Sequence, residues 1–363
     1  MIPRSALAAG RPDLPGGGDD LPSFSIILPT YNRADVVEQT LVQLLAQDYP
    51  ADRIEILVCD NSTDGTPEMV ERVAATAASP VHLVASDERL PAVKRNQGLR
   101  QATGDLVMFI NDDVWFRPDA LREHVRSHAA HAQPVAVVGL VEQSAQMPPT
   151  AFIEWYRPFG YEPIAHLADQ AVPYRFHWSM NLSLPREVLL ERNLVFHEDW
   201  ANIGHEDIEL GYRWTQAGYD VIYNPKAWGE HFHPHDLDSA CRLQYSVGRG
   251  LRDLEVLIPE PQLTERYGLF KWSNSPRAVA RGVARKALFN RATVPPLQRR
   301  LAHLDRRSRL AEWTFWKIML HHTDAGYLAQ PPRRPIPVPT RPALPHDGPV
   351  PADARAHELE VAS

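Results

Sequence analysis

Leu106-Val107-Met108-Phe109-Ile110-Asn111-Asp112-Asp113 is an apolar run that ends in an amide and two carboxylates. A short apolar run bounded by polar residues is typical of a strand that is buried on both faces of a sheet. The three polar residues would then lie at the carboxyl end of that strand. Because hard divalent cations prefer oxygen ligands, the stretch predicts a metal or polar-ligand site at a strand end.

The chain on either side of this run alternates between strand and helix patterns. Strands are expected at residues 24–28, 54–59, 81–85, 106–110, 135–141 and 221–223. Helices are expected at residues 36–45, 92–103 and 206–218, and two more are expected to begin at Thr66 and at Pro118. Thr66-Pro67-Glu68 is typical of an N-cap followed by proline at the first helical position. Gly104 is expected to end the helix over residues 92–103. This alternation predicts an α/β fold with a mostly parallel sheet and helices on both faces.

Polar clusters follow three of these strands. They are Pro29-Thr30-Tyr31-Asn32-Arg33, Asp60-Asn61 and Asn111-Asp112-Asp113. In open α/β sheets, ligands bind beyond the carboxyl ends of the strands. We therefore expect the three clusters to converge at one sheet edge. Turns that use proline and Asx residues only for their shape are the alternative.

The sequence divides into five parts. We expect a flexible leader over 1–22, a nucleotide half over about 23–141, an acceptor half over about 142–235, a helical extension over 236–330 and a Pro-rich disordered tail over 331–363. The aromatic stretch within 142–180 is expected to be irregular. Residues 277–291 and 299–309 are strongly basic, which fits either peripheral contact with an anionic membrane surface or a solvated helix face.

Composition limits the function and the location. The net charge of −7 argues against a general nucleic-acid binder, which needs a basic surface. Two cysteines and no visible signal peptide or apolar membrane span favour a reducing, cytoplasmic compartment. The sequence does not indicate an oligomeric state.

Six motifs together resemble family 2 glycosyltransferases of the GT-A fold, over about residues 23–235. They are Pro29 to Arg33, Cys59 to Thr66, Lys94-Arg95-Asn96-Gln97-Gly98, Gly104-Asp105, Asn111-Asp112-Asp113 and Glu206 to Arg213, in that order. The motifs are weak singly and specific as an ordered set. The resemblance implies an inverting enzyme that moves a sugar from a nucleoside diphosphate to an acceptor hydroxyl.

The resemblance also implies a donor site. The nucleotide-sugar would contact Pro29, Thr30, Tyr31, Arg33, Asp60, Asn61, Arg95, Asn111 and Asp112. Asp60 can accept from the ring N–H of uracil or thymine, which favours UDP or dTDP. Asp113 and His231 would hold Mn²⁺ or Mg²⁺, which stabilises the departing diphosphate. His233 would point the same way as His231 in an extended segment.

The helix expected to start at residue 206 is predicted to carry the catalytic residues. The resemblance implies that Asp207 is the general base, and Glu206 would orient Asp207 or the acceptor; simple capping of the helix is the alternative. Trp178 and Asn181 would line the acceptor pocket. The sequence does not distinguish among a glycan, a lipid-linked saccharide and a small natural product as the acceptor.

Competing functions lack their motifs. A dehydrogenase needs a Gly-rich loop after its first strand, and a nucleotidyltransferase needs a Gly-rich loop closed by lysine there. Pro29 to Arg33 occupies that position instead. A nucleotide-binding scaffold without turnover remains the alternative, and it is favoured by Asn111, where the family pattern has aspartate.

Overall fold

The computed structural model describes residues 21–148, 150–156, 160–199, 204–234, 236–258, 276–302, 304 and 306–331. By contacts the chain divides into two compact units, Met1–Arg333 and Arg334–Ser363. The predicted leader up to residue 20 and the predicted tail after residue 331 lie outside the described residues. All structural statements below concern the described part of the first unit.

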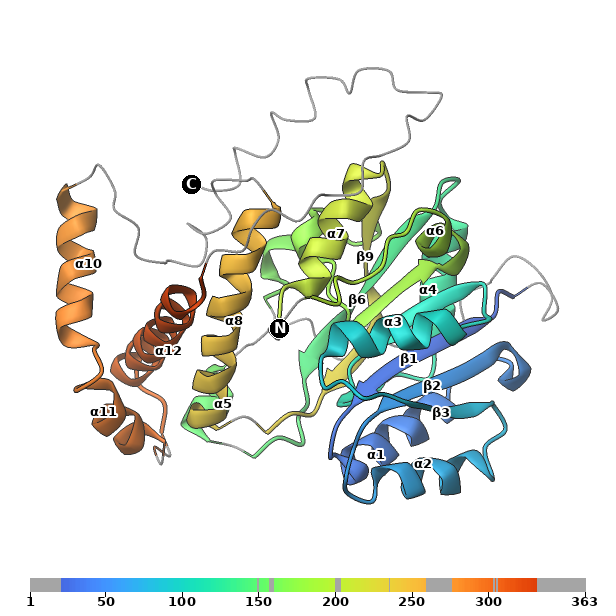
Figure 1. Ribbon diagram of the computed structural model, residues 1–363, viewed down its shortest axis with the longest axis horizontal. Coiled ribbons are helices and arrows are strands. Elements are labelled where there is room, and N and C mark those ends of the chain that lie inside the picture. Colours follow the sequence, from blue (N-terminus) through green and yellow to red (C-terminus); the bar gives the residue numbers. More distant parts are fainter. Residues whose placement is uncertain are drawn as a thin grey trace. The chain divides into compact units, whose positions relative to one another are not determined.

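Four parallel strands form the first half of the sheet. β1 (Phe24–Thr30), β2 (Ile54–Asp60), β3 (Val81–Ala85) and β4 (Leu106–Ile110) lie in the order β3-β2-β1-β4. Figure 1 shows α1 (Ala34–Leu45) and α2 (Thr66–Ala74) on one face and α3 (Pro91–Gln101) on the other. Right-handed crossovers explain this arrangement, because the strand order reverses direction after β3.

The second half of the sheet mixes strand directions. β5 (Val114–Phe116), β6 (Val135–Gln143), β7 (Gln170–Val172), β8 (Asn181–Pro185) and β9 (Asp220–His231) complete the nine-stranded sheet. β8 lies antiparallel between β4 and β6, whereas β6 and β9 pair in parallel. β5 and β7 pair antiparallel with β9. Because β6 pairs with both β8 and β9, the halves predicted on either side of residue 141 share one sheet.

The remaining helices complete the fold. They are α4 (Ala120–Ala129), α5 (Ala151–Trp155), α6 (Arg186–Glu191), α7 (Glu206–Gln216), α8 (Leu237–Leu257), α10 (Pro276–Leu288), α11 (Val294–Leu301) and α12 (Arg309–Ala329). The largest apolar cluster surrounds the sheet, and a second one joins α5, α8, α11 and α12. The expected helical extension is therefore present in the described residues. None of the described helices is long and apolar enough to cross a bilayer.

Several predicted element ends shift. α2 begins at Thr66 itself, with Gly65 as N-cap, because Asp64 Oδ1 accepts from the Thr66 amide at 3.0 Å. α3 ends at Gln101, before Gly104. Gly104 lies so close to the β1 backbone that a Cβ there would be 2.7 Å from Ser25 N. α4 begins two residues after Pro118, at Ala120. The strand predicted over 221–223 extends over all of β9.

Candidate functional site

The carboxyl ends of β1, β2 and β4 meet at the point where the strand order reverses. Thr30 ends β1 beside Asp60, which ends β2. Thr30 Oγ1 donates to Asp112 Oδ2 at 2.7 Å and joins β1 to the turn after β4. Thr40 on α1 donates to the Asp112 carbonyl oxygen at 2.6 Å. The convergence expected of these clusters is therefore observed, at the kind of switch point where α/β sheets bind ligands.

The turns after β1 and β2 are locked together by side chains. Asp60 Oδ1 accepts from the Ser62 amide at 2.9 Å and from Ser62 Oγ at 2.5 Å. Ser62 Oγ accepts from the Asn32 amide at 2.6 Å, and Asn32 Oδ1 accepts from the Thr63 amide at 2.8 Å. Asn32 has a φ of 52°, a left-handed conformation that asparagine tolerates. These bonds fix a rigid two-turn wall at the sheet edge.

Two cations support the same wall. Lys94 is buried, and its Nζ donates to the Thr30 carbonyl oxygen and, at 2.6 Å, to Asn61 Oδ1. The Arg89 guanidinium lies 4.3 Å from the centre of the Tyr31 ring. Neither Lys94 nor its neighbour Arg95 on α3 is a solvated surface cation, because both are buried. Lys94 instead holds the ends of β1 and β2 in place.

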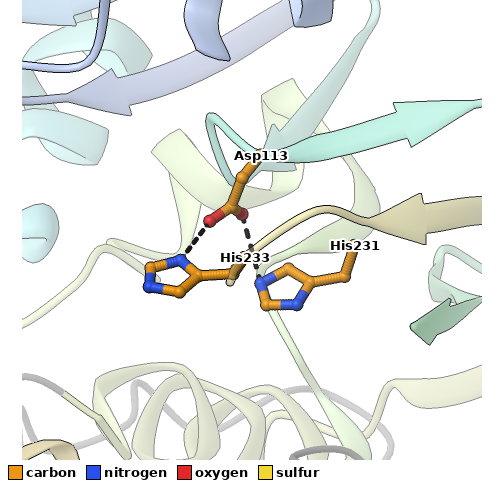
Figure 2. A group of neighbouring side chains, drawn as sticks. All are labelled: Asp113, His231 and His233. Atoms are coloured by element: carbon orange, nitrogen blue, oxygen red, sulfur yellow. Dashed lines mark hydrogen bonds and ion pairs between the residues drawn. The ribbon is translucent and has the colours of Figure 1, made fainter. Parts of the chain in front are cut away.

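Asp113 contacts two histidines from the end of β9. Its Oδ1 lies 3.2 Å from His231 Nε2, and its Oδ2 lies 2.7 Å from His233 Nδ1. Figure 2 shows both rings directed at the carboxylate, and the three potential ligand atoms lie within 4.8 Å of one another. The β5–β9 pairing causes this, since it sets Val114 opposite His231. Arg33 Nη1 contacts Asp113 Oδ2 at 2.9 Å and Asp112 Oδ1 at 2.7 Å.

This cluster fits a divalent cation. Asp113 Oδ1 is buried and, among the described residues, has no hydrogen-bond partner in good geometry, although it lies within ion-pair distance of His231. Burial alone would raise the pKa of Asp113, but His231, His233 and Arg33 hold that pKa well below its usual range. The carboxylate is therefore ionised and ready to bind a metal. Burial, followed by the charge of Asp113, raises the pKa of Asp112 to about 6.

Asp207 lies in the first turn of α7, which follows a left-handed residue, His205, with a φ of 73°. Asp207 Oδ2 accepts from the Ser179 amide at 3.1 Å and from Ser179 Oγ at 3.3 Å, and Oδ1 accepts from the Ile208 amide at 2.8 Å. Burial, followed by the negative charge of Glu206, raises the pKa of Asp207 to about 6. A positioned carboxylate with this pKa can take up a proton near neutral pH.

Arg95 connects the acidic helix to the turn after β4. Its Nη1 lies 2.8 Å from Glu206 Oε1, and these side chains are only 5% and 7% exposed. Its Nη2 donates to Asn111 Oδ1 at 3.2 Å. Glu206 Oε2 also accepts from the Gly204 amide at 2.9 Å. The Arg95 guanidinium therefore bridges Asn111 and Glu206. It links the turn that leads to Asp113 with the helix start that carries Asp207.

The chain resembles known proteins over much of its length. Residues 25–179 match the family described as Glycosyl transferase family 2. The chain is similar to this family over those residues. A validoxylamine A glucosyltransferase of Streptomyces hygroscopicus subsp. jinggangensis is 26% identical over 327 residues, which cover 78% of this glycosyltransferase and 76% of the relative.

Two further likenesses agree with this match. The poly(ribitol-phosphate) beta-N-acetylglucosaminyltransferase TarS of Staphylococcus aureus (strain Mu50) is 30% identical over 116 residues, 32% of this chain and 20% of the relative. The solved structure of the mannosyltransferase PcManGT from Pyrobaculum calidifontis superposes with a TM-score of 0.61 at 24% identity, covering 89% of this chain and 92% of that one. The latter confirms the GT-A fold.

Two residues predicted to line the acceptor pocket of this glycosyltransferase have structural partners. Asn181 is fully buried at the start of β8, where Oδ1 contacts His124 Nε2 and Nδ2 donates to the Ala227 carbonyl oxygen, both at 2.8 Å. Trp178 packs edge-on against Tyr161, with ring centres 4.9 Å apart, and borders the sheet core. These contacts position the second half of the sheet, so neither residue carries the proposal below.

The roles predicted for Asp113, His231 and Asp207 stay predictions, and the structure adds two contacts at this site that sequence reasoning missed. Ser179, which donates twice to Asp207, carried no motif of its own. Lys94 belongs to one of the six motifs, but its contacts with the ends of β1 and β2 were not predicted. Their partners lie 28 and 64 residues away, and only the fold brings such residues together.

Proposed function

We propose that this glycosyltransferase transfers a hexose from a nucleoside diphosphate to an acceptor hydroxyl, with inversion at the anomeric carbon and with help from a divalent metal. One observation carries the proposal: the Arg95 guanidinium touches both the turn that leads to Asp113 and the helix start that carries Asp207. A leaving-group site and a base are thus held at one sheet edge. Displacement with inversion requires the leaving group and the base to lie on opposite sides of the transferred sugar.

The ligand set supports Mn²⁺ over Mg²⁺. Asp113 offers a carboxylate, whereas His231 and His233 offer imidazole nitrogens. Mg²⁺ favours oxygen ligands, but transition metals accept imidazole readily. When bound, the metal would act as a Lewis acid on the diphosphate that leaves. PcManGT, which shares the fold, was solved with GDP-Man and Mn²⁺.

Asp207 would then remove the proton of the acceptor hydroxyl as the new bond forms. Ser179 and Ile208 hold its two oxygens, so the carboxylate keeps one orientation. Glu206 is already bound to Arg95, so its role is to place and polarise Asp207 rather than to touch the acceptor. No second carboxylate is needed as nucleophile when one displacement inverts the anomeric carbon.

The donor and acceptor follow from the site and from the relatives. The rigid wall at Asp60 favours a pyrimidine base, as in UDP or dTDP, because a carboxylate can accept from its ring N–H. The name of the relative that matches over 327 residues, validoxylamine A glucosyltransferase, makes glucose and validoxylamine A the first donor sugar and acceptor to test. Both cysteines are free and buried, in keeping with a cytoplasmic, reducing compartment.

The decisive experiment combines ligand binding with transfer. Purified protein is heated with UDP, dTDP or GDP and their glucose conjugates, with Mn²⁺, with Mg²⁺ or with EDTA. Binding to the folded state raises the melting temperature by mass action. We expect a pyrimidine nucleotide to do so with Mn²⁺, and we expect Asp207→Asn to keep this shift while losing sugar transfer.

The metal ligands are tested in the same assay. His231→Ala and His233→Ala should each weaken Mn²⁺ binding by at least the roughly 10- to 100-fold that the loss of an outer-shell partner costs. His166→Ala, which removes an exposed histidine, is the matched control. Nucleotide binding without any transfer would favour the scaffold alternative, and the absence of any Mn²⁺-dependent shift would refute the metal site.

A further inference from the structure

The C-terminal helices expose large apolar side chains. Leu288 is 62% exposed at the end of α10, and Leu310, Trp313 and Trp316 on α12 are 72%, 46% and 50% exposed. The three α12 residues follow at three-residue spacing, which puts them on neighbouring turns of one side. Phe289, next to Leu288, packs edge-on against Trp313 with ring centres 5.5 Å apart. We refer to Leu288, Leu310, Trp313 and Trp316 as the tryptophan patch.

The region that carries this patch is rich in positive charge. Residues 276–331 contain eleven Lys and Arg against three Asp and Glu, in a chain whose net charge is −7. The Lys317 ammonium lies 3.7 Å from the centre of the Trp316 ring. Glu312 and Asp324, the two described acids of this region, are each paired with an arginine, at 2.8 and 2.7 Å. The exposed basic residues are Lys286, Arg291, Arg299, Arg300, Arg306, Arg307 and Arg309.

We infer that the tryptophan patch docks this protein onto an anionic lipid surface. Tryptophan prefers the interfacial layer of a bilayer, and leucines beside it can enter the upper acyl region. Arginine and lysine around such a patch are attracted to anionic headgroups. A second copy of the chain fits less well, because pairing two patches would bring two strongly basic surfaces together. Nucleic acid offers the charge but no apolar layer for exposed leucines.

This docking goes beyond the transfer chemistry. Every residue assigned above to the donor site or the base lies between positions 29 and 233, and none belongs to α10, α11 or α12. The helices are joined to one another through the Arg285–Asp324 ion pair at 2.7 Å and the contact of His321 Nδ1 with the Phe289 carbonyl oxygen at 3.1 Å. The patch can therefore be altered without touching the proposed catalytic machinery.

The test is co-sedimentation of the full chain with lipid vesicles. Vesicles of phosphatidylcholine alone are compared with vesicles that also contain phosphatidylglycerol, at an ionic strength of about 0.1 M, where charges act over about 10 Å. We expect binding to the anionic vesicles only, and loss of most binding at about 1 M salt, where that range falls to about 3 Å. Trp313→Ser/Trp316→Ser should weaken binding by about tenfold or more.

Two further double variants complete the test, one in the patch and one as a control. Leu288→Ser/Leu310→Ser changes the most exposed members of the patch and serves if removing Trp313 disturbs Phe289. Val42→Ser/Leu83→Ser, at exposed apolar positions of α1 and β3, is the matched control and should bind like the wild type. Transfer activity on a water-soluble acceptor should be equal in all of them.

Equal binding to both kinds of vesicle, binding to neither, or unchanged binding of both patch variants would each overturn the inference. A dimer in sedimentation equilibrium that the patch variants dissociate would assign the surface to a second copy instead. Binding of the soluble polyanion heparin without vesicle binding would reject a lipid partner as well.

Discussion

At the scale of single residues, the proposed reaction depends on the protonation of Asp207. Its pKa is raised to about 6, first by burial and then by the charge of Glu206. A general base acts in its deprotonated form, so kcat/KM should be constant above pH 6. It should fall about tenfold per pH unit once the pH is below 6.

The variant Glu206→Gln tests directly whether Asp207 is the group that titrates. The change removes the negative charge that raises the Asp207 pKa and leaves Arg95 unpaired beside it, and both effects favour the ionised base. The acidic limb of the kcat/KM profile should therefore move to lower pH, even if the maximal rate drops. A limb that stays near pH 6 in this variant would assign the titration to a group other than Asp207.

Residue-level prediction from sequence was most specific where a residue type has few uses in its setting. A carboxylate directly after a buried strand and an acidic pair at a helix start both indicate chemistry, and Asp113 and Asp207 are positioned for it. The partners could not be predicted in the same way. The Arg95 side chain could have faced a diphosphate or solvent, and only the fold brings Glu206 to within 2.8 Å of it.

At the scale of elements, the Arg95–Glu206 pair fastens α3 to α7. Both side chains are almost completely buried, so removing one partner leaves an uncompensated charge. Arg95→Met should lower the free energy of unfolding by about 3–5 kcal/mol, whereas Arg95→Met/Glu206→Met should recover most of that loss. The double variant should still transfer sugar slowly, because Asp207 has lost its neighbour. Urea unfolding of the three variants measures these differences.

Arg100 and Glu198 provide the control, because they join α3 to the segment before α7 at 2.9 Å while being 58% and 46% exposed. Exposed pairs contribute only about 0–1 kcal/mol, so Arg100→Met should be nearly neutral. If the buried and exposed substitutions cost the same, the pair does not fasten the two helices.

Close contact between α8 and α12 depends on two glycines. A Cβ at Gly248 would lie 2.1 Å from the Thr323 carbonyl oxygen, and one at Gly326 would lie 1.9 Å from the Tyr245 carbonyl oxygen. Neither backbone can yield alone, so Gly248→Ala or Gly326→Ala should force the helices apart and cost about 1–3 kcal/mol or more. Gly65→Ala, where a Cβ meets nothing within 4 Å, should cost only the roughly 0.5 kcal/mol by which alanine is worse than glycine at an N-cap.

Element prediction succeeded for β1, β2 and β4, because strands covered on both faces are continuous apolar runs. It also succeeded for β3, although three of the five β3 residues are exposed. It failed for β8, which sequence reasoning assigned to a pocket lining. Asn181 and Ser183 interrupt its apolar pattern, yet both are buried. His124 and His128, one turn apart on α4, contact these two side chains at 2.8 Å and satisfy them inside the fold. A polar residue with a distant partner cannot be told from a loop residue in sequence alone.

At the scale of the whole molecule, charge and apolar surface are unevenly distributed. The region 276–331 is strongly basic within an acidic chain, and it contains the exposed residues of the tryptophan patch. The sequence revealed the basic stretches but not which side chains they leave exposed. Helix packing decides that, since Phe315 is buried while its neighbour Trp316 is half exposed.

The two apolar clusters also suggest two units of stability within residues 1–333. Phe315 lies at the centre of the second cluster, edge-on to Phe152 with ring centres 5.3 Å apart, and it is fully buried. Phe315→Ala should destabilise this cluster by about 3–5 kcal/mol. Because the donor site is built on the first cluster, we expect calorimetry of the variant to resolve two transitions, with the nucleotide and Mn²⁺ raising only the upper one.

Trp316→Ala is the control for this experiment, because Trp316 is 50% exposed and removing it leaves no buried cavity. Its melting curve should match that of the wild type. A single transition in Phe315→Ala that shifts as a whole with nucleotide would mean that both clusters unfold together. The C-terminal helices would then be part of the fold that holds the donor site, and variants of α12 would weaken nucleotide binding as they lower stability.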